Sequence, residues 1–328
     1  MTLPALLVSI ITTVLAPILL MIGIGAFVRY RFKLDLGTLA KLNLWVFGPA
    51  FVFDKVANST LAWSAMGGVV LVTALQVACL GALVFGIGKA ARVAPQTLSA
   101  VALATMFYNA GNYGIPLAEL AFPSRLGERD GAAIQAFVVL CQNLLNFTLG
   151  MYLATRHQPG RSGFAGAIAS IFTLPAVPVV LLALLARTYL QADPSHALPV
   201  FISKTTSYLS LGLVPVALVT LGAQLATEWR WPRWRPIGLV LVLRLLVGPA
   251  LMTVLLYGLH LTGWLDLWPW PAELLIITAA VPTAVNTLLL TIETNGDTEL
   301  AADCVFWTTI LSPLTLTLTI ACTRLAFG

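Results

Sequence analysis

Long apolar runs recur along almost the whole chain, and they constrain the fold more than any other feature of the sequence. Hydrophobic residues make up 59% of the 328 residues and charged residues only 9%, whereas soluble globular chains carry about 25% charged residues. The mean hydropathy is +0.92. A helix of about 20 apolar residues crosses the hydrocarbon layer of a bilayer. The sequence therefore predicts an all-α integral membrane protein that crosses the cell (inner) membrane many times.

The apolar runs predict ten transmembrane helices. We place them at 4–28, 36–53, 65–88, 98–122, 132–154, 166–189, 199–225, 236–261, 271–292 and 300–325. An even number of spans puts both termini on one side of the membrane. Ten Lys and Arg residues follow odd-numbered spans and five follow even-numbered spans. Because basic loops stay in the cytosol, both termini are predicted to lie outside.

A hydrophilic stretch at 156–165 divides the chain, with five predicted spans on each side. Prolines recur in matching order, in the first and sixth spans and in the second and seventh. If the halves are copies, an odd number of spans per half requires that the second half is inserted upside down. We therefore predict two inverted five-helix repeats, residues 1–155 and 166–328, joined by a short cytosolic linker at 156–165.

The fourth and ninth spans are each interrupted near their middle. The fourth holds YNAGNYGIP at 108–116, and the ninth holds AAVPTAVN at 279–286. A proline inside a helix costs about 3 kcal/mol, and a glycine up to about 1 kcal/mol relative to alanine. Irregular backbone at this depth is tolerated only beside a polar cavity or inside protein.

Such an interruption creates a binding site, because a helix that begins again presents free N–H groups and the positive end of its dipole. Pro116 suits the first turn of the second helical segment, where its missing N–H is not needed. In the predicted topology the two broken spans run in opposite directions, so their restarting ends meet at the bilayer midplane. We expect an anion site at the crossing, formed around Gly114, Pro116 and Pro282. The alternative is two kinked helices with a packing role.

Polar side chains near the breaks are the predicted substrate ligands. Three of them lie three and four residues apart in the fifth span and so share one face of a helix. We assign substrate binding to Asn109, Asn112, Gln142, Asn143, Asn146 and Asn286. Hydrogen bonding between helices is the alternative role for the amides of the fifth span.

Arg244 lies deep in the eighth span, where its side chain does not easily reach water. It is a candidate counter-charge for an anionic substrate. The alternative is a structural ion pair with Asp303 or Glu273. Neither a metal site nor a cofactor is expected, because the three histidines lie far apart and the four cysteines form no CxxC pair.

These motifs resemble those of the auxin efflux carrier family over essentially the whole chain. The most specific parts are N-x(5)-I-P from Asn109 to Pro116, the stretch AAVPTAVN and the neighbourhood of Gln142. Val52 and Ile292 stand where auxin carriers have a serine and a lysine, which argues against auxin as the substrate.

The resemblance implies a ten-helix fold like that of sodium/proton antiporters and bile-acid transporters, with a crossover of the broken helices 4 and 9. Helices 1, 2, 6 and 7 would form a scaffold, and helices 3–5 and 8–10 a transport domain. It also implies that Asn109 and Gln142 contact the substrate, and that the protein forms a homodimer through helices 2 and 7.

We therefore expect a secondary transporter of a small organic anion such as a carboxylate, working by elevator-type alternating access. A sodium- or proton-coupled symporter of the bile-acid type is the alternative, and a sensor that uses this fold without turnover also stays open. An enzyme is not expected, because the chain has no H-E-x-x-H, D-x-x-x-D or G-x-S-x-G motif. Nucleic acid is not an expected partner, since the basic residues are spread over short loops.

Overall fold

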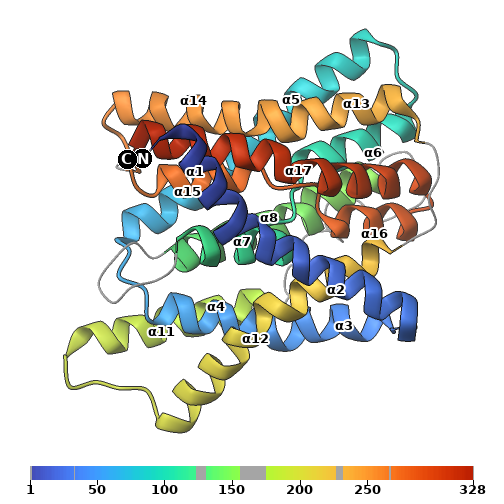
Figure 1. Ribbon diagram of the computed structural model, residues 1–328. Helices are drawn as coiled ribbons and strands as arrows, with labels where there is room; N and C mark the ends of the chain where they lie inside the picture. Colours follow the sequence, from blue (N-terminus) through green and yellow to red (C-terminus); the bar gives the residue numbers. More distant parts are fainter. Residues whose placement is uncertain are drawn as a thin grey trace.

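A computed structural model of the chain is helical throughout its described part (Figure 1), which comprises residues 2–32, 34–122, 131–155, 175–226, 232–265 and 267–327. Within those ranges strand-like pairing is limited to one isolated bridge, between Tyr108 and Thr283. Among the described residues, seven helices are long and apolar enough to cross a membrane. The predicted all-helical class of an integral membrane protein is therefore confirmed, whereas its location in the inner membrane stays a prediction.

Seven of the ten predicted spans correspond to these long helices: Leu3–Phe32, Leu36–Ala57, Trp63–Ala90, Gly131–Thr155, Val200–Leu225, Trp234–Leu261 and Thr298–Phe327. The fourth and ninth predicted spans are interrupted, and each forms shorter helices. The sixth begins outside the described residues and continues as α11 (Ala176–Ala192). The predicted linker at 156–165 also lies outside the described residues, and the count of ten stays a prediction.

One group of helices combines the beginnings of both predicted halves. In the lower part of Figure 1, α2 (Ala16–Phe32) packs along α12 (Val200–Leu225), and α4 (Gly48–Ala57) packs on α11 and α12. A Cβ on Gly25 or on Gly222 would collide with the backbone of the opposite helix. These glycines therefore permit the close α2–α12 crossing, as small residues do between helices in lipid.

The second span, which also belongs to this group, begins at an N-cap residue. Asp35 accepts hydrogen bonds from the amides of Gly37 and Thr38 at the beginning of α3 (Leu36–Leu42), which continues through the π-helical turn η2 (Asn43–Phe47) into α4. An N-cap carboxylate satisfies amides that have no partner within the helix. We call α2, α3, η2, α4, α11 and α12 the lower group.

All the remaining described helices except α1 form the second group, in the upper and middle parts of Figure 1. α5 (Trp63–Ala90) packs on α6 (Pro95–Met106) and on α8 (Gly131–Leu145). α14 (Gly248–Leu261) packs on α15 (Ala272–Ala279), and α13 (Trp234–Val242) packs on α17 (Thr298–Phe327). The short helices are α7 (Ile115–Ala121), α9 (Met151–Thr155) and α16 (Val285–Glu293). We call α5–α9 and α13–α17 the upper group.

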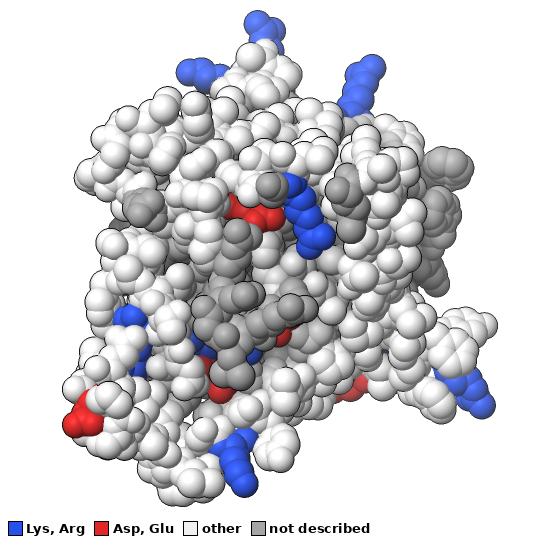
Figure 2. Space-filling model, turned by 60° about the vertical axis from the view of Figure 1, so that its left-hand side comes forward, with Lys and Arg blue, Asp and Glu red and all other residues white. Residues whose placement is uncertain are grey.

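The outer surface is largely apolar. Leu181, Leu185, Val254 and Leu314 are among the large hydrophobic side chains that point outward. Figure 2 shows a face on which the charged side chains are few and scattered. Extensive exposed apolar surface marks contact with a membrane or a partner, which agrees with a multi-pass membrane protein.

Both chain ends lie on the same side of the molecule (Figure 1). α1 (Leu3–Ile10), which leads through the turn η1 (Ile11–Leu15) into α2, contacts the C-terminal helix α17. This placement agrees with an even number of membrane crossings. The side of the membrane on which the termini lie stays a prediction.

Candidate functional site

The two interrupted spans are broken beside each other. α6 ends at Met106, and the chain becomes helical again at the π-helical turn η3 (Ala110–Gly114), which leads into α7. α15 and α16 are separated by residues 280–284. The amide of Asn109 donates to the Pro282 carbonyl at 2.8 Å, and the amide of Ala284 donates to the Phe107 carbonyl at 3.0 Å. The two breaks therefore pair with each other and satisfy backbone groups that neither helix can satisfy alone.

Gln135 of α8 connects the two breaks through its side chain. Its Nε2 donates to the Ala110 carbonyl at 2.8 Å, and its Oε1 accepts from the Thr278 hydroxyl at 2.7 Å. A Cβ on Gly114 would lie 2.5 Å from that Nε2. The glycine predicted at the crossing thus leaves the space that Gln135 occupies, while Pro116 lies in the first turn of α7.

Thr283 secures the second break, next to Pro282. Its hydroxyl donates to the Ala104 carbonyl of α6 at 2.7 Å, and its amide donates to the Thr308 hydroxyl of α17 at 3.1 Å. The hydroxyl and the amide of this fully buried residue are therefore both bonded, as burial requires.

A cavity of about 350 Å³ lies beside the paired breaks, between the upper and lower groups. All six predicted substrate ligands line it: Asn109, Asn112, Gln142, Asn143, Asn146 and Asn286. The lower group contributes Asn43, Val52 and Leu213 to the opposite wall. Cavities of this size hold small-molecule ligands.

The cavity runs from a buried end to an exposed mouth. Asn109 is 5% exposed and Asn146 is 3% exposed, whereas Lys41, Leu289 and Glu293 line the same cavity and are exposed. Lys41 lies near the start of the continuous helix Leu36–Ala57, and Glu293 lies at the end of α16. The cavity therefore opens at the side of the molecule where this helix starts and α16 ends.

Two buried amides present their NH₂ groups as unpaired donors. Asn109 Oδ1 accepts from the amide of Asn112 at 3.1 Å, and Gln142 Oε1 accepts from the amide of Tyr108 at 3.4 Å. Since a backbone N–H can only donate, these contacts identify the oxygen end of each side chain. Asn109 Nδ2 and Gln142 Nε2 have no hydrogen-bond partner within the described part of the chain.

Backbone donors add to this set where the helices begin again. Gly111 in η3 and both Val285 and Asn286 in α16 line the cavity, and their amides have no acceptor among the residues that the structure describes. The first amides of a helix lack intrahelical partners and lie at its positive end. The inner end of the cavity therefore presents unpaired donors from side chains and backbone, while unpaired acceptor oxygens of Asn43, Asn146 and Gln224 lie elsewhere on its lining.

Arg244 does not lie among the residues that line this cavity. It is fully buried, and its guanidinium donates to the carbonyls of Thr105 and Ala279. Its hydrogen bonds thus go to the backbone, and no ion pair joins it to Asp303 or Glu273 within the described residues.

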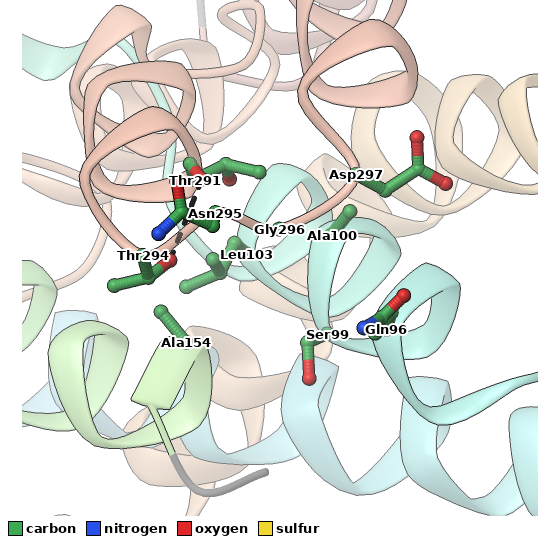
Figure 3. A pocket seen from close by; sticks show the side chains of 10 residues that line it. All are labelled: Gln96, Ser99, Ala100, Leu103, Ala154, Thr291, Thr294, Asn295, Gly296 and Asp297. Atoms are coloured by element: carbon green, nitrogen blue, oxygen red, sulfur yellow. Dashed lines mark hydrogen bonds between the residues drawn. The ribbon is translucent and has the colours of Figure 1, made fainter. Parts of the chain in front are cut away.

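A second, smaller cavity of about 50 Å³ lies between α6, α9, α16 and the start of α17 (Figure 3). It is lined by Gln96, Ser99, Ala100, Leu103, Ala154, Thr291, Thr294, Asn295, Gly296 and Asp297. In Figure 3 the Asp297 carboxylate points away from Thr294 and Asn295. This volume suits a few water molecules, so the larger cavity is the candidate site.

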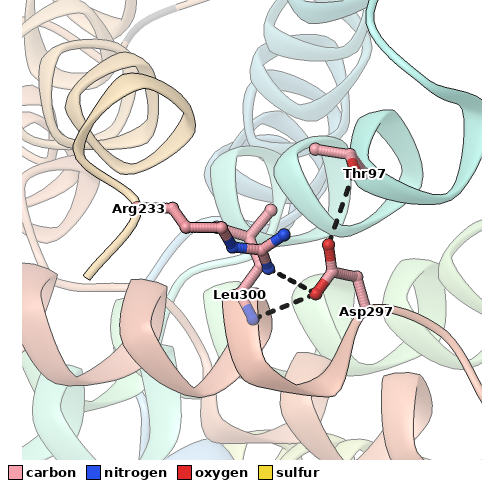
Figure 4. A network of polar contacts seen from close by, with 4 residues as sticks. All are labelled: Thr97, Arg233, Asp297 and Leu300. Carbon is pink, nitrogen blue, oxygen red and sulfur yellow. Dashed lines mark hydrogen bonds and ion pairs between the residues drawn. The ribbon is translucent and has the colours of Figure 1, made fainter. Parts of the chain in front are cut away.

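The Asp297 carboxylate connects α6, the start of α13 and the start of α17 (Figure 4). It pairs with Arg233 at 2.5 Å, accepts from the Leu300 amide at 3.2 Å and accepts from the Thr97 hydroxyl at 3.4 Å. Burial alone would raise the pKa of this carboxyl, but the bonds from Arg233 and Leu300 outweigh it and lower the pKa. Its stabilising effect is therefore complete at neutral pH and lost only as the pH falls through that lowered pKa.

The sequence analysis did not predict the roles of Gln135 and Thr283, or the lower-group residues that form the opposite wall of the cavity. A signal existed for Gln135, because it lies seven residues before Gln142 and so on nearly the same helix face. Thr283 lies inside the predicted break at 279–286, but its hydrogen bonds could not be predicted, because threonine is ordinary in membrane helices and its partners come from distant segments.

Comparison with known proteins decides what kind of protein carries this site. Residues 10–320 match the family described as "Membrane transport protein". The chain belongs to this family of membrane transporters. The resemblance to the auxin efflux carriers is thereby confirmed.

Similar transporters occur in archaea and bacteria. The transporter is 24% identical over 288 residues to an uncharacterized transporter of Methanocaldococcus jannaschii, covering 85% of this chain and 87% of the relative. It is 27% identical over 290 residues to a Rhizobium meliloti protein named "Putative malonate transporter", covering 86% of this chain and 85% of the relative.

Proposed function

We propose that the transporter carries a small organic anion with at least one carboxylate group, and that this anion binds in the 350 Å³ cavity. The observation that carries the proposal is the set of unpaired donors on Asn109 and Gln142 and at the restarted helices. Carboxylate oxygens only accept hydrogen bonds, and a lining of donors at positive helix ends complements them. The name of the Rhizobium meliloti relative supports the same substrate class.

The packing supports two inverted five-helix repeats with a crossover of broken helices. In the first half α5 packs on α6 and α8, and in the second half α14 and α13 pack on α15 and α17. The first span of each half packs on the second span of the other, as α2 on α12 and α11 on α4. Two copies related by a pseudo-two-fold axis produce this exchange.

Transport then follows from a displacement of the upper group against the lower group. The upper group carries the donors, and the lower group supplies the opposite wall with Val52 and Leu213. Sliding the donors along that wall moves the site from one side of the membrane to the other, in the manner of an elevator. The mouth beside Lys41 and Glu293 lies at span ends that the basic loops assign to the cytosol.

Counterflow in proteoliposomes tests the proposal. Vesicles loaded with unlabelled malonate should accumulate labelled malonate saturably, and malate and indole-3-acetate extend the panel to other acids. Malonamide has the same skeleton without charge and should not compete. The double variant Asn109→Asp, Gln142→Glu keeps both amide-oxygen contacts but removes both donors, so it serves as the matched inactive protein.

Imposed gradients separate the two modes of coupling. Net uptake of malonate that responds to membrane potential alone indicates an uncoupled anion carrier, since one charge gains about 2.3 kcal/mol per 100 mV. A requirement for sodium or a proton gradient indicates the symporter instead. Absence of exchange for every acid, in wild-type protein that is folded and monodisperse, contradicts the anion assignment.

A further inference from the structure

Arg244 lies at the carboxyl-terminal ends of two helices at once. It belongs to the π-helical turn η5 (Leu243–Val247), between α13 and α14. Its Nη1 donates to the Thr105 carbonyl at 3.0 Å, and its Nη2 donates to the Ala279 carbonyl. These carbonyls belong to the last turns of α6 and α15, immediately before the two breaks.

The positive charge of the Arg244 guanidinium is balanced by the negative ends of α6 and α15. The carboxyl-terminal end of a helix carries about −0.5 elementary charge, so two such ends together match one guanidinium. A buried cation without a compensating partner is very unfavourable, and the two helix ends provide that compensation here. The opposite, positive ends at η3 and α16 remain available on the cavity side.

Arg244 also contacts a residue of the cavity wall. Its Cζ lies 4.7 Å from the ring centroid of Tyr108, a geometry in which a desolvated cation is attracted to the ring. Tyr108 lines the cavity, and its amide donates to Gln142 Oε1. Arg244 is therefore connected through Tyr108 to the side chain that presents Nε2 as a donor.

The helix that carries Arg244 leaves space for its side chain. A Cβ on Gly248 would lie 2.8 Å from Arg244 Nη2 and 3.1 Å from the Ala279 carbonyl oxygen. Gln76 of α5 donates to the Gly248 carbonyl at 3.1 Å and fixes this turn against the neighbouring helix. The guanidinium is thus held in a position that any larger residue at 248 would disturb.

We propose that Arg244 is a positioning residue that joins the ends of α6 and α15, neutralises both, and holds Tyr108 in place without contacting the substrate. This role goes beyond binding of the anion, which the proposed function assigns to the opposite ends of the broken helices. Its effect on transport rests on the proposed function, but its effect on the breaks does not.

Hydrogen exchange measured by mass spectrometry tests the role without any substrate. Peptides covering 104–114 and 279–287 report on the breaks, and peptides from α12 report on the lower group. In Arg244→Met, exchange in both break peptides should rise roughly tenfold or more, because hydrogen bonds from a charged donor are lost, while α12 is unchanged. Arg244→Lys keeps a cationic donor and should stay within about threefold of wild type.

Two alanine variants of the same helix complete the design. Gly248→Ala leaves Arg244 in the sequence but displaces its guanidinium, so exchange should rise in the same two peptides. Gly258→Ala is the matched control, since nothing lies within 4 Å of its added Cβ. Break peptides that exchange as in wild type in both Arg244→Met and Gly248→Ala would overturn the proposal, as would a uniform rise that includes α12.

Malonate counterflow then separates positioning from direct contact with substrate. A positioning role predicts that Gly248→Ala loses malonate affinity although the cation is retained. Normal affinity in Gly248→Ala, combined with loss in Arg244→Met, would instead make Arg244 a counter-charge and overturn the role. If wild-type protein transports no acid, the exchange experiment still decides the role of Arg244.

Discussion

At the scale of single residues, the backbone decides which end of an amide side chain the cavity meets. Asn109 and Gln142 could each present an oxygen or an NH₂ group, but the amides of Asn112 and Tyr108 occupy the two oxygens. The free ends are therefore donors, which complement an anion. This orientation depends on contacts across the break, and the residue types alone do not determine it.

Replacing Asn109 by Asp tests this orientation. An aspartate keeps an oxygen for the Asn112 amide but replaces the NH₂ donor by a second oxygen with negative charge. We expect the KM for malonate to rise at least roughly tenfold, because a hydrogen bond to a charged group is lost and repulsion is added. Thermal unfolding should change little.

A matched variant controls for the added charge. Asn58 is an exposed amide at the end of α4 that donates to the Asp54 carbonyl, and it does not line the cavity. Asn58→Asp should therefore leave the KM unchanged. An unchanged KM in Asn109→Asp would remove Asn109 from the binding site.

At the scale of elements, the two breaks are where prediction from the sequence succeeded best and also where it stopped. Proline, glycine and asparagine carry local conformational signals, so the interruptions at 108–116 and 279–286 could be placed from the sequence. Their partners could not, because Gln135 and Arg244 reach them only through the packing of α8 and η5 against both breaks. The same limit applies to Thr308, whose hydroxyl accepts from the Thr283 amide of another span.

Two alanine substitutions within η3 separate the stability of a break from its function. In Gly114→Ala the new Cβ collides with Gln135 Nε2, whereas nothing lies within 4 Å of a Cβ on Gly111. Overpacking of this kind costs about 1–3 kcal/mol, so Gly114→Ala should lower the Tm in detergent. Gly111→Ala should keep the wild-type Tm but weaken malonate binding, since Gly111 lines the cavity. Equal Tm values for both variants would show that Gln135 does not hold the break.

At the scale of the whole molecule, an ion pair joins the two groups at the side opposite the cavity mouth. Lys55 of α4 lies 3.2 Å from Glu119 of α7. Lys41 and Lys55 belong to one continuous helix, Leu36–Ala57, and 14 residues of helix separate them by about 21 Å. The structure is therefore open at one side, while a contact between the groups closes the other.

Breaking this ion pair should shift the molecule away from the mouth-open state. A cysteine introduced at Leu289, which lines the mouth and is 46% exposed, reports that state by its rate of maleimide labelling after Cys79 and Cys322 are replaced by serine. Partly exposed pairs contribute about 0.2–1 kcal/mol, so labelling in Lys55→Met should slow by up to about fivefold. The exchange of both charges, Lys55→Glu with Glu119→Lys, should restore the rate.

The ion pair between Arg233 and Asp297 provides the control (Figure 4). It joins the starts of α13 and α17, which both belong to the upper group, so it does not connect the two groups. Arg233→Gln should leave the labelling of the mouth cysteine unchanged. If the cysteine at position 289 is labelled equally fast with and without Lys55→Met, as it should be with and without Arg233→Gln, the Lys55–Glu119 contact does not hold the two groups together.

The pairing of the two breaks also limits how the chain can change in length. Asn109 with Pro282 and Phe107 with Ala284 fix a single register between segments that lie far apart in the sequence. An extra residue in either break would slide one segment along the other, and a shift of one residue turns alternate side chains to the opposite face. Asn109 would then point away from the cavity, and Thr283 would leave the Ala104 carbonyl. Insertions and deletions should therefore be tolerated in the loops between spans and rejected at 107–114 and 280–284, and a scan of single-residue insertions would reveal these two segments as the least permissive of the chain.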